Sequence, residues 1–165
     1  MRAAVVMFVY AGLVLALGAI AFVMAPEGAS ALTAILIPGI FSVLMDGCGI
    51  FTLVAWRRQN DARIPVLISL LLLLAFVGGS LPRALAAGDA ATAHQNAMTD
   101  FRKQVESGEL PDTEDARLDY LESQGAPLHD KSYQRNILWL LVAVSGLAFG
   151  VILWAYRADR SQRAT

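Results

Sequence analysis

The most regular feature of the sequence is a pattern of four long apolar runs separated by polar segments. As an α-helix rising 1.5 Å per residue, a run of about 20 residues crosses the ~30 Å hydrocarbon core of a bilayer. Asp, Glu, Lys and Arg are almost absent from the runs and gather between and after them. The pattern predicts an all-α integral membrane protein, with one membrane domain over residues 1–165 and four transmembrane helices at about 4–25, 31–55, 64–85 and 136–156.

The long segment between the third and fourth runs, residues 86–135, is polar but carries the start and stop signals of further helices. Ser80 can cap a turn that is opened by Leu81 and Pro82, near the end of the third span. A new helix can begin at Asp89 or Thr92 and end at Gly108, because Gly is the residue that most readily adopts the left-handed conformation after a helix.

A second short helix is predicted further along this segment. Thr113 is a suitable N-cap for residues 114–123, acidic residues occupy the first turn, and Gly125 followed by Pro127 ends the helix. We expect the two helices to form a short helical hairpin in the loop between the third and fourth spans. Its apolar face is a candidate surface for a partner protein and comprises Phe101, Val105, Leu118 and Leu121.

Charges are segregated if the four spans alternate in direction. Residues 83–135 contain ten acidic and six basic side chains, whereas the opposite side collects arginines. The positive-inside rule then predicts cytoplasmic N- and C-termini and places the loop 86–135 outside, in the periplasm. Arg outnumbers Lys by eleven to two, which is typical of GC-rich bacterial genomes and favours a bacterial inner (cytoplasmic) membrane. The arginines on the predicted inner side are Arg2, Arg57, Arg58, Arg63, Arg157, Arg160 and Arg163.

The first run begins as a secretory signal peptide does, with a basic residue before apolar ones. We expect it to stay uncleaved, because it is longer than a typical signal core. The small-residue site that ends at Ala25 is also followed directly by Pro26.

Small residues indicate where the helices pack. Inside lipid, helices associate through close backbone approach at small side chains and through interhelical hydrogen bonds. Steps of three, four and three residues predict one packing face on the second span, formed by Gly39, Ser42, Asp46 and Gly49. Further helix–helix contacts are predicted on the first and fourth spans, where Gly146 and Gly150 form a GxxxG step, at Gly12, Ala16, Ser145, Gly146 and Gly150.

Asp46 is the only carboxylate inside an apolar run. A charged Asp near the centre of a transmembrane helix costs roughly 2.5–3.5 kcal/mol on insertion scales, and no Lys, Arg or His lies at a matching depth in the other spans. Three interpretations remain open. The carboxyl can be protonated and hydrogen-bonded to Ser145 or to a backbone carbonyl, it can contact a partner or cofactor, or it can belong to a proton or cation pathway.

Other chemistry finds little support in the sequence. Cys48 is the only cysteine, so no intrachain disulfide can form, and His94 and His129 match no compact metal motif. The chain carries no nucleophile elbow, HExxH motif, phosphate-binding loop or paired catalytic carboxylates. We therefore predict no catalytic activity, no cofactor, no metal and no nucleic-acid binding. With 56% hydrophobic and 16% charged residues, the chain also has little material for a soluble domain.

The run from Ala31 to Phe41, with its Thr-Ala-Ile-Leu-Ile-Pro segment, resembles a stretch in small uncharacterised bacterial integral membrane proteins, such as those of planctomycetes. In those proteins a similar run opens the second of several spans. This chain differs from them in an additional Ile before Pro38, in Asp46 and in the long loop. The resemblance covers one helix and implies no function.

The sequence thus leads to two functional hypotheses. The first is a non-catalytic accessory, structural or assembly subunit of a larger membrane protein complex, whose partners are the bilayer and other membrane subunits, with a hetero-complex favoured over a homo-oligomer. The alternative is a small homo-oligomeric transporter or channel in which Asp46 lines the path.

Overall fold

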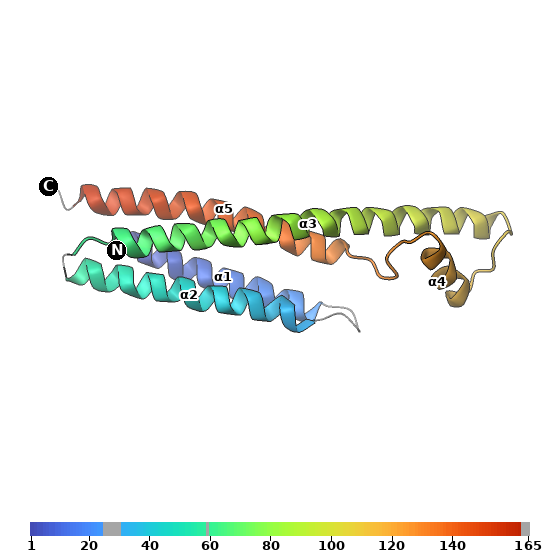
Figure 1. Cartoon of the computed structure of the whole chain (residues 1–165), viewed down its shortest axis with the longest axis horizontal. Coiled ribbons are helices and arrows are strands. Elements are labelled where there is room, and N and C mark those ends of the chain that lie inside the picture. Colours follow the sequence, from blue (N-terminus) through green and yellow to red (C-terminus); the bar gives the residue numbers. More distant parts are fainter. Residues whose placement is uncertain (25–30, 59, 163–165) are drawn as a thin grey trace. The chain divides into compact units, whose positions relative to one another are not determined.

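The computed structural model describes residues 1–24, 31–58 and 60–162, and every regular element in this part of the chain is a helix. Contacts divide the chain into two units. Unit 1 comprises Met1–Ser80 and Trp139–Thr165, and unit 2 comprises Leu81–Leu138. The elements, labelled in Figure 1, are α1 (Arg2–Val23), α2 (Ala31–Arg57), α3 (Arg63–Glu106), α4 (Glu114–Ser123) and α5 (Ser132–Ser161).

Four of these helices, α1, α2, α3 and α5, are long and apolar enough to cross a membrane. This confirms the prediction of an all-helical chain with four long apolar helices. Each contains a stretch of 18 residues with high mean hydropathy and few charged side chains. This agrees with the long uncharged runs seen in the sequence. The predicted end of the first span at Ala25, with Pro26 beyond it, lies outside the described residues.

The third helix differs from its prediction. A capped break at Ser80 and a new helix from Asp89 or Thr92 were expected, but α3 continues without interruption through Pro82 to Glu106. Pro82 cannot donate the backbone hydrogen bond to the carbonyl four residues earlier, which costs about 3 kcal/mol in a helix interior. The following stretch favours helix strongly, because seven of the fourteen residues from Ala84 to Ala97 are alanine.

Within unit 1, α1 packs against α2 along a strip of small and aromatic side chains. Gly49 of α2 lies so close to the ring of Phe8 that a Cβ atom there would be 2.9 Å from it. The ring of Phe41 meets Tyr10 edge-on at 6.1 Å between centroids and stacks on Phe76 of α3 at 4.3 Å. Aromatic contacts thus link three of the four helices of this unit.

One end of unit 1 is held by polar contacts. The Asp159 carboxylate near the end of α5 accepts hydrogen bonds from the Met1 amine at 2.7 Å and from the backbone N–H groups of Arg2 and Ala3, both at 3.2 Å. A carboxylate at this position is favoured by the dipole at the start of α1. The Tyr156 hydroxyl donates to Asp61 at 3.3 Å.

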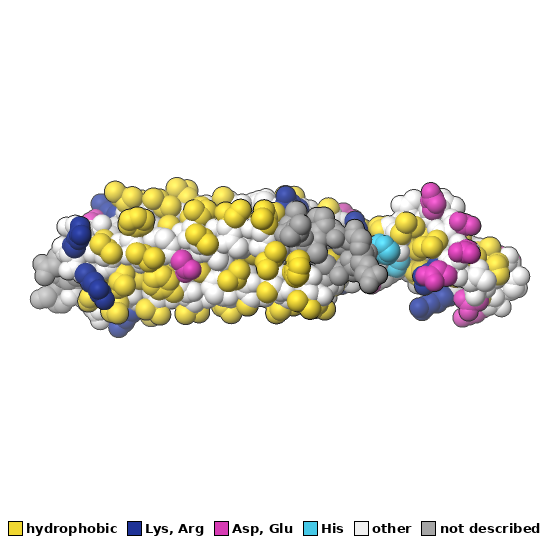
Figure 2. All heavy atoms as spheres, turned by 90° about the horizontal axis from the view of Figure 1, so that it is seen from below, with side chains coloured by type: hydrophobic (Ala, Val, Ile, Leu, Met, Phe, Trp, Pro, Cys, Tyr) yellow, Lys and Arg dark blue, Asp and Glu magenta, His cyan; other side chains and the backbone are white. Residues whose placement is uncertain are grey.

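Hydrophobic side chains cover most of the face of unit 1 that Figure 2 shows, and Lys and Arg side chains gather at one end. The contacts of Asp159 with the start of α1 and of Tyr156 with Asp61 place the start of α1, the end of α5 and the turn between α2 and α3 at the same end. The exposed arginines at this end are Arg2, Arg57, Arg58, Arg63, Arg157 and Arg160.

In unit 2, the short helix α4 has the bounds and caps that the sequence predicted. Thr113 is its N-cap, with the hydroxyl accepting from the Ala116 N–H at 3.3 Å. Gly125 follows the helix with a φ of +62°, a left-handed conformation that Gly adopts without strain. The Ala126 N–H then donates to the Leu121 carbonyl at 2.9 Å, which completes a Schellman motif.

The end of α3 uses the same device. Gly108 has a φ of +79°, and the Glu109 N–H donates to the Gln104 carbonyl at 2.9 Å. The prediction that a helix ends at Gly108 is therefore confirmed, although that helix starts much earlier than expected.

The core of unit 2 is small. The rings of Phe101 and Tyr120 lie 5.6 Å apart, and the Gln104 amide donates to the Tyr120 hydroxyl at 3.3 Å. His94 Nδ1 lies 2.6 Å from the carbonyl oxygen of Pro127. These contacts fix α4 and the segment after it against the second half of α3.

Asp130 lies just before α5 and binds the first residue of that helix. Its carboxylate accepts from both the hydroxyl of Ser132, at 2.6 Å, and the backbone N–H of Ser132, at 2.8 Å. These two hydrogen bonds hold the pKa of Asp130 below its ordinary value of 3.8, because they stabilise the charged form.

We predict that Gly49→Leu lowers the stability of the protein by about 1–3 kcal/mol, because the new side chain would displace the Phe8 ring from the contact between α1 and α2. Gly47→Leu is the matched control, since a Cβ at Gly47 meets no atom within 4 Å. Both variants gain the same helix propensity. Thermal unfolding in mild detergent measures the difference, and equal effects of the two variants would contradict the described packing.

We predict that Asp130→Ala lowers stability at pH 7 by about 0.5–1 kcal/mol, through loss of the hydrogen bonds that start α5. Since the folded-state pKa of Asp130 is lowered, its stabilisation is complete above the unfolded pKa and is lost as pH falls through the folded pKa. The difference between Asp130→Ala and the native chain should therefore shrink in acid. Asp130→Asn, which keeps an acceptor oxygen but does not titrate, is the control in detergent melts across this pH range.

Candidate functional site

The candidate site is the polar face of α2, and the structure divides its four residues into two pairs. Ser42 and Gly49 are buried, with Ser42 only 4% exposed. Gly39 and Asp46 are partly exposed, and a Cβ atom at Gly39 would meet no other atom within 4 Å. The two pairs lie next to each other on the helix, at the border between the packed face and the outer face of α2.

The buried pair is used inside unit 1. The Ser42 hydroxyl lies within hydrogen-bond distance of two carbonyl oxygens, that of Ala11 in α1 at 2.9 Å and that of Pro38 in its own helix at 2.8 Å. Gly49 allows the Phe8 ring to approach the α2 backbone. These two residues therefore hold α2 against α1.

Asp46 has no such partner. Among the residues that the structure describes, none forms a hydrogen bond or an ion pair with its carboxylate. On the outer side of α2 it is flanked by the exposed aliphatic side chains of Val43 and Ile50. The carboxylate thus lies partly open to the surroundings, in the middle of an apolar helix.

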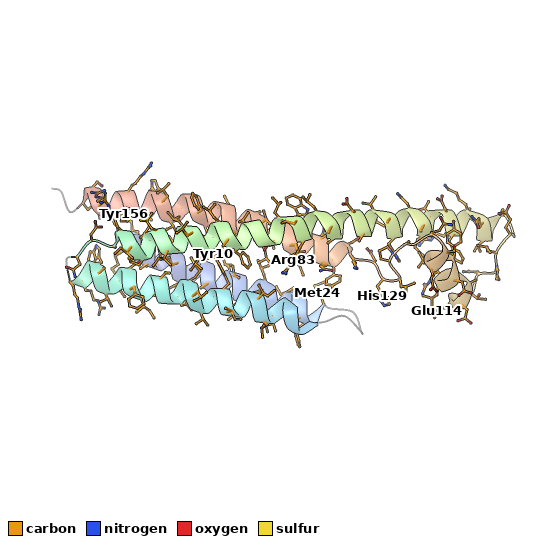
Figure 3. All side chains as sticks on the ribbon, in the orientation of Figure 1. Tyr10, Met24, Arg83, Glu114, His129 and Tyr156 are labelled. Carbon is orange, nitrogen blue, oxygen red and sulfur yellow. The ribbon has the colours of Figure 1, made fainter. Side chains whose placement is uncertain are left out.

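One interpretation of the sequence was a hydrogen bond between the Asp46 carboxyl and Ser145, and the structure does not contain this bond. The Ser145 hydroxyl donates to the Leu141 carbonyl at 2.6 Å and lies 2.7 Å from the Tyr10 hydroxyl. Because the single proton of Ser145 goes to Leu141, Tyr10 is the donor in the second bond. Ser145 is fully buried in this pair, and Figure 3 labels Tyr10 on α1.

The Tyr10–Ser145 pair is the polar contact that sequence reasoning missed. Both residues were visible as hydroxyl groups inside apolar runs, on the first and fourth spans. Their depths along antiparallel helices are similar, which was the available signal. The rotation of each helix about its axis decides which hydroxyl groups meet, and the sequence pattern does not fix it.

The other predicted helix contacts lie on the outside of unit 1. Gly12 and Ala16 of α1 are exposed, as are Gly146 and Gly150 of α5. A Cβ atom at any of these three glycines would meet nothing within 4 Å. Of the five residues predicted for these two helices, only Ser145 is buried in the described part of the chain.

The predicted outer-loop surface is largely internal. Phe101 is 3% exposed and Leu121 is 1% exposed, so both side chains fill the core of unit 2. Val105 and Leu118 are partly exposed and are the two members of this set that a partner can reach. Glu114 and His129, also in unit 2, are labelled in Figure 3 and are exposed.

No group of three or more His, Cys, Asp or Glu side chains within the described part of the chain could hold a metal ion. A small pocket lies at the arginine-rich end of unit 1, between Trp56, Asp61, Tyr156 and Asp159. Its two carboxylates already have partners, since Asp61 contacts Arg63 and Tyr156, and Asp159 binds the start of α1. In the apolar stretches that the structure describes, Asp46 is the only carboxylate, and it has no hydrogen-bond or ion-pair partner.

Comparison with known proteins yields no family for this chain: no family model, no curated protein and no solved structure matches it. The function proposed below rests on the residues of the chain themselves.

We predict unequal effects from removing either hydroxyl of the Tyr10–Ser145 pair. Tyr10→Phe leaves Ser145 bonded to Leu141, so it should cost about 0.5–1.5 kcal/mol. Ser145→Ala leaves the buried Tyr10 hydroxyl without its acceptor and should cost more, about 1–3 kcal/mol.

The double variant completes the thermodynamic cycle for this pair. Its cost should be smaller than the sum of the two single costs, because the unpaired hydroxyl left by Ser145→Ala is then also gone. Thermal unfolding in detergent measures all three variants. Strict additivity would contradict a direct bond between the two hydroxyl groups.

Proposed function

We propose that this protein is a non-catalytic accessory or assembly subunit of a larger membrane protein complex. The observation that carries the proposal is the carboxylate of Asp46, partly exposed on an apolar helix and without a partner in the part of the chain that the structure describes. Such a group facing lipid tails would cost roughly 2.5–3.5 kcal/mol on insertion scales. A neighbouring subunit that covers it removes this cost.

The rest of unit 1 supports this interpretation by contrast. No buried side-chain oxygen or nitrogen in the described residues lacks a hydrogen-bond partner. The hydroxyl groups of Ser42, Ser69 and Ser145 all donate to carbonyl oxygens within the bundle. In a bundle that satisfies its own hydroxyl groups so fully, an open carboxylate indicates a contact completed by another molecule.

In the proposed arrangement α1, α2, α5 and the apolar part of α3 span a bacterial inner membrane. The arginine-rich end of unit 1 faces the cytoplasm, in accordance with the positive-inside rule. The predicted outer loop, residues 86–135, with its excess of carboxylates, is then periplasmic, and its residues Val105 and Leu118 are available to a partner.

A homo-oligomeric transporter or channel is the second candidate, and the same partly exposed carboxylate favours it. Proton and cation pathways generally string several ionisable groups through the membrane. Residues 4–23, 35–55, 64–82 and 136–155 contain one Asp, Glu, Lys, Arg or His in all, which is Asp46. The accessory subunit is therefore the better supported function.

Extraction from source membranes in mild detergent, followed by size separation and identification of comigrating proteins, tests the proposal. We expect the native chain to migrate with other membrane proteins in a particle much larger than its own 17.7 kDa. A small particle that contains this chain alone would contradict the accessory role.

The second candidate is tested on the same material after reconstitution into vesicles. Proton-coupled or cation flux that Asp46→Asn abolishes would favour the transporter, because Asn keeps the shape of the side chain but cannot carry a charge. Ser42→Ala, which alters a neighbouring polar group of the same helix, is the control for nonspecific effects on the bundle.

A further inference from the structure

We propose that one side of α2 receives a transmembrane helix of a different protein, and that this helix carries a Lys, Arg or His side chain opposite Asp46. The inference rests on the proposed function and specifies its contact. The surface, here called the α2 seam, comprises Gly39, Val43, Asp46, Ile50 and Leu53.

The spacing of the α2 seam is that of a helix-packing interface. Its residues follow one another at steps of four, three, four and three, the heptad pattern of helices that cross at about +20°. Val43 is 71% exposed and Ile50 is 53% exposed, while the other three residues are partly exposed. Unit 1 therefore leaves the seam accessible along its whole length.

Gly39 gives the seam a point of close approach. A Cβ at this position would meet no atom of unit 1 within 4 Å, so the absent side chain leaves room on the outer side of the helix. The space beside Gly49, in contrast, is occupied by the ring of Phe8 from α1. The open space beside Gly39 favours close approach of a second helix to the α2 backbone there.

The opposite outer strip of α2 comprises Ile40, Leu44, Gly47, Phe51 and Val54, which follow the same steps, and a Cβ at Gly47 would also meet no atom within 4 Å. Leu44 and Phe51 are exposed to a similar degree, at 48% and 69%, but no ionisable side chain lies between them on their side of the helix. Such an apolar strip can face lipid tails without leaving a polar side chain unpaired. The carboxylate distinguishes the α2 seam from this lipid-facing strip.

The carboxylate also specifies the occupant. A second copy of the chain packed symmetrically on the α2 seam would bring two Asp46 carboxylates together, where like charges oppose each other. The apolar segments of this chain supply no Lys, Arg or His that a second copy could offer instead. A basic side chain on the helix of another protein would neutralise Asp46 and hydrogen-bond to it.

Site-specific photocrosslinking in native membranes tests the position of the partner. A benzophenone amino acid is placed at Val43 or Ile50, with Leu44 and Phe51 of the opposite strip as matched controls on the same helix. We expect protein adducts from Val43 and Ile50 only, joined to a protein other than this chain. Adducts at twice the mass of the chain, adducts to lipid alone, or equal adducts from both strips would overturn the inference.

Charge variants test the chemistry. Asp46→Lys should abolish the adduct from Val43, and Asp46→Asn should lower its yield about tenfold or more, because the basic side chain of the partner loses its counter-charge. Thermal unfolding of each purified variant shows whether unit 1 itself remains folded. Adducts that are unchanged in both variants would exclude the proposed ion pair, even if the crosslinks lie on the α2 seam.

The two levels of proposal fail differently. If the native chain comigrates with a complex but crosslinks from positions other than the α2 seam, the accessory role stands and the contact proposed here is wrong. If the native chain migrates alone, both fail.

Discussion

In an apolar helical bundle, each polar side chain must find its hydrogen-bond partner within the protein, and this constraint shapes unit 1. The Ser42 hydroxyl reaches the carbonyl of Ala11 in the neighbouring helix, and the hydroxyl of Tyr10 reaches Ser145 across from α1 to α5. Each of these bonds replaces contact with water and also fixes how one helix is rotated against another. The polar residues of the spans are few, but they select one packing among many that apolar side chains alone would allow.

Small residues respond to the same constraint, but their role depends on what lies opposite. Gly49 and Gly47 are two residues apart in α2, yet only Gly49 has a partner, the ring of Phe8. Gly146 and Gly150 form the best GxxxG step in the sequence and still face outward with open space beyond them. A small side chain therefore permits close approach, and a complementary group on the other helix is needed before a contact forms.

The sequence predicted what depends on local chemistry. Thr113 and Gly125 determined both ends of α4, and four apolar runs predicted four long apolar helices. Prediction failed where two local signals competed, since Ser80 and Pro82 suggested a break that the alanine-rich stretch after them overrides. One interpretation of Asp46 also failed, because the answer depends on helix rotation: Ser145 was considered as its hydrogen-bond partner, but Ser145 bonds to Tyr10. Phe101 and Leu121 were recognised as one apolar set, and whether they face a partner or each other depends on tertiary packing.

Asp46 does not meet the requirement that each polar side chain of the bundle has a hydrogen-bond partner, because its carboxylate has none within the described chain. An unpaired carboxylate on an apolar helix costs more than the ~1 kcal/mol that a typical internal hydrogen bond contributes. Nothing in the packing of α2 against α1 requires it, because Ser42 and Gly49 already provide the polar and close contacts there. A residue that burdens the isolated chain and does not support its fold is best explained by an interaction outside it. The exposed residues on either side of Asp46 follow the heptad spacing of helices that pack along their length. We therefore expect the partner element to be one further helix.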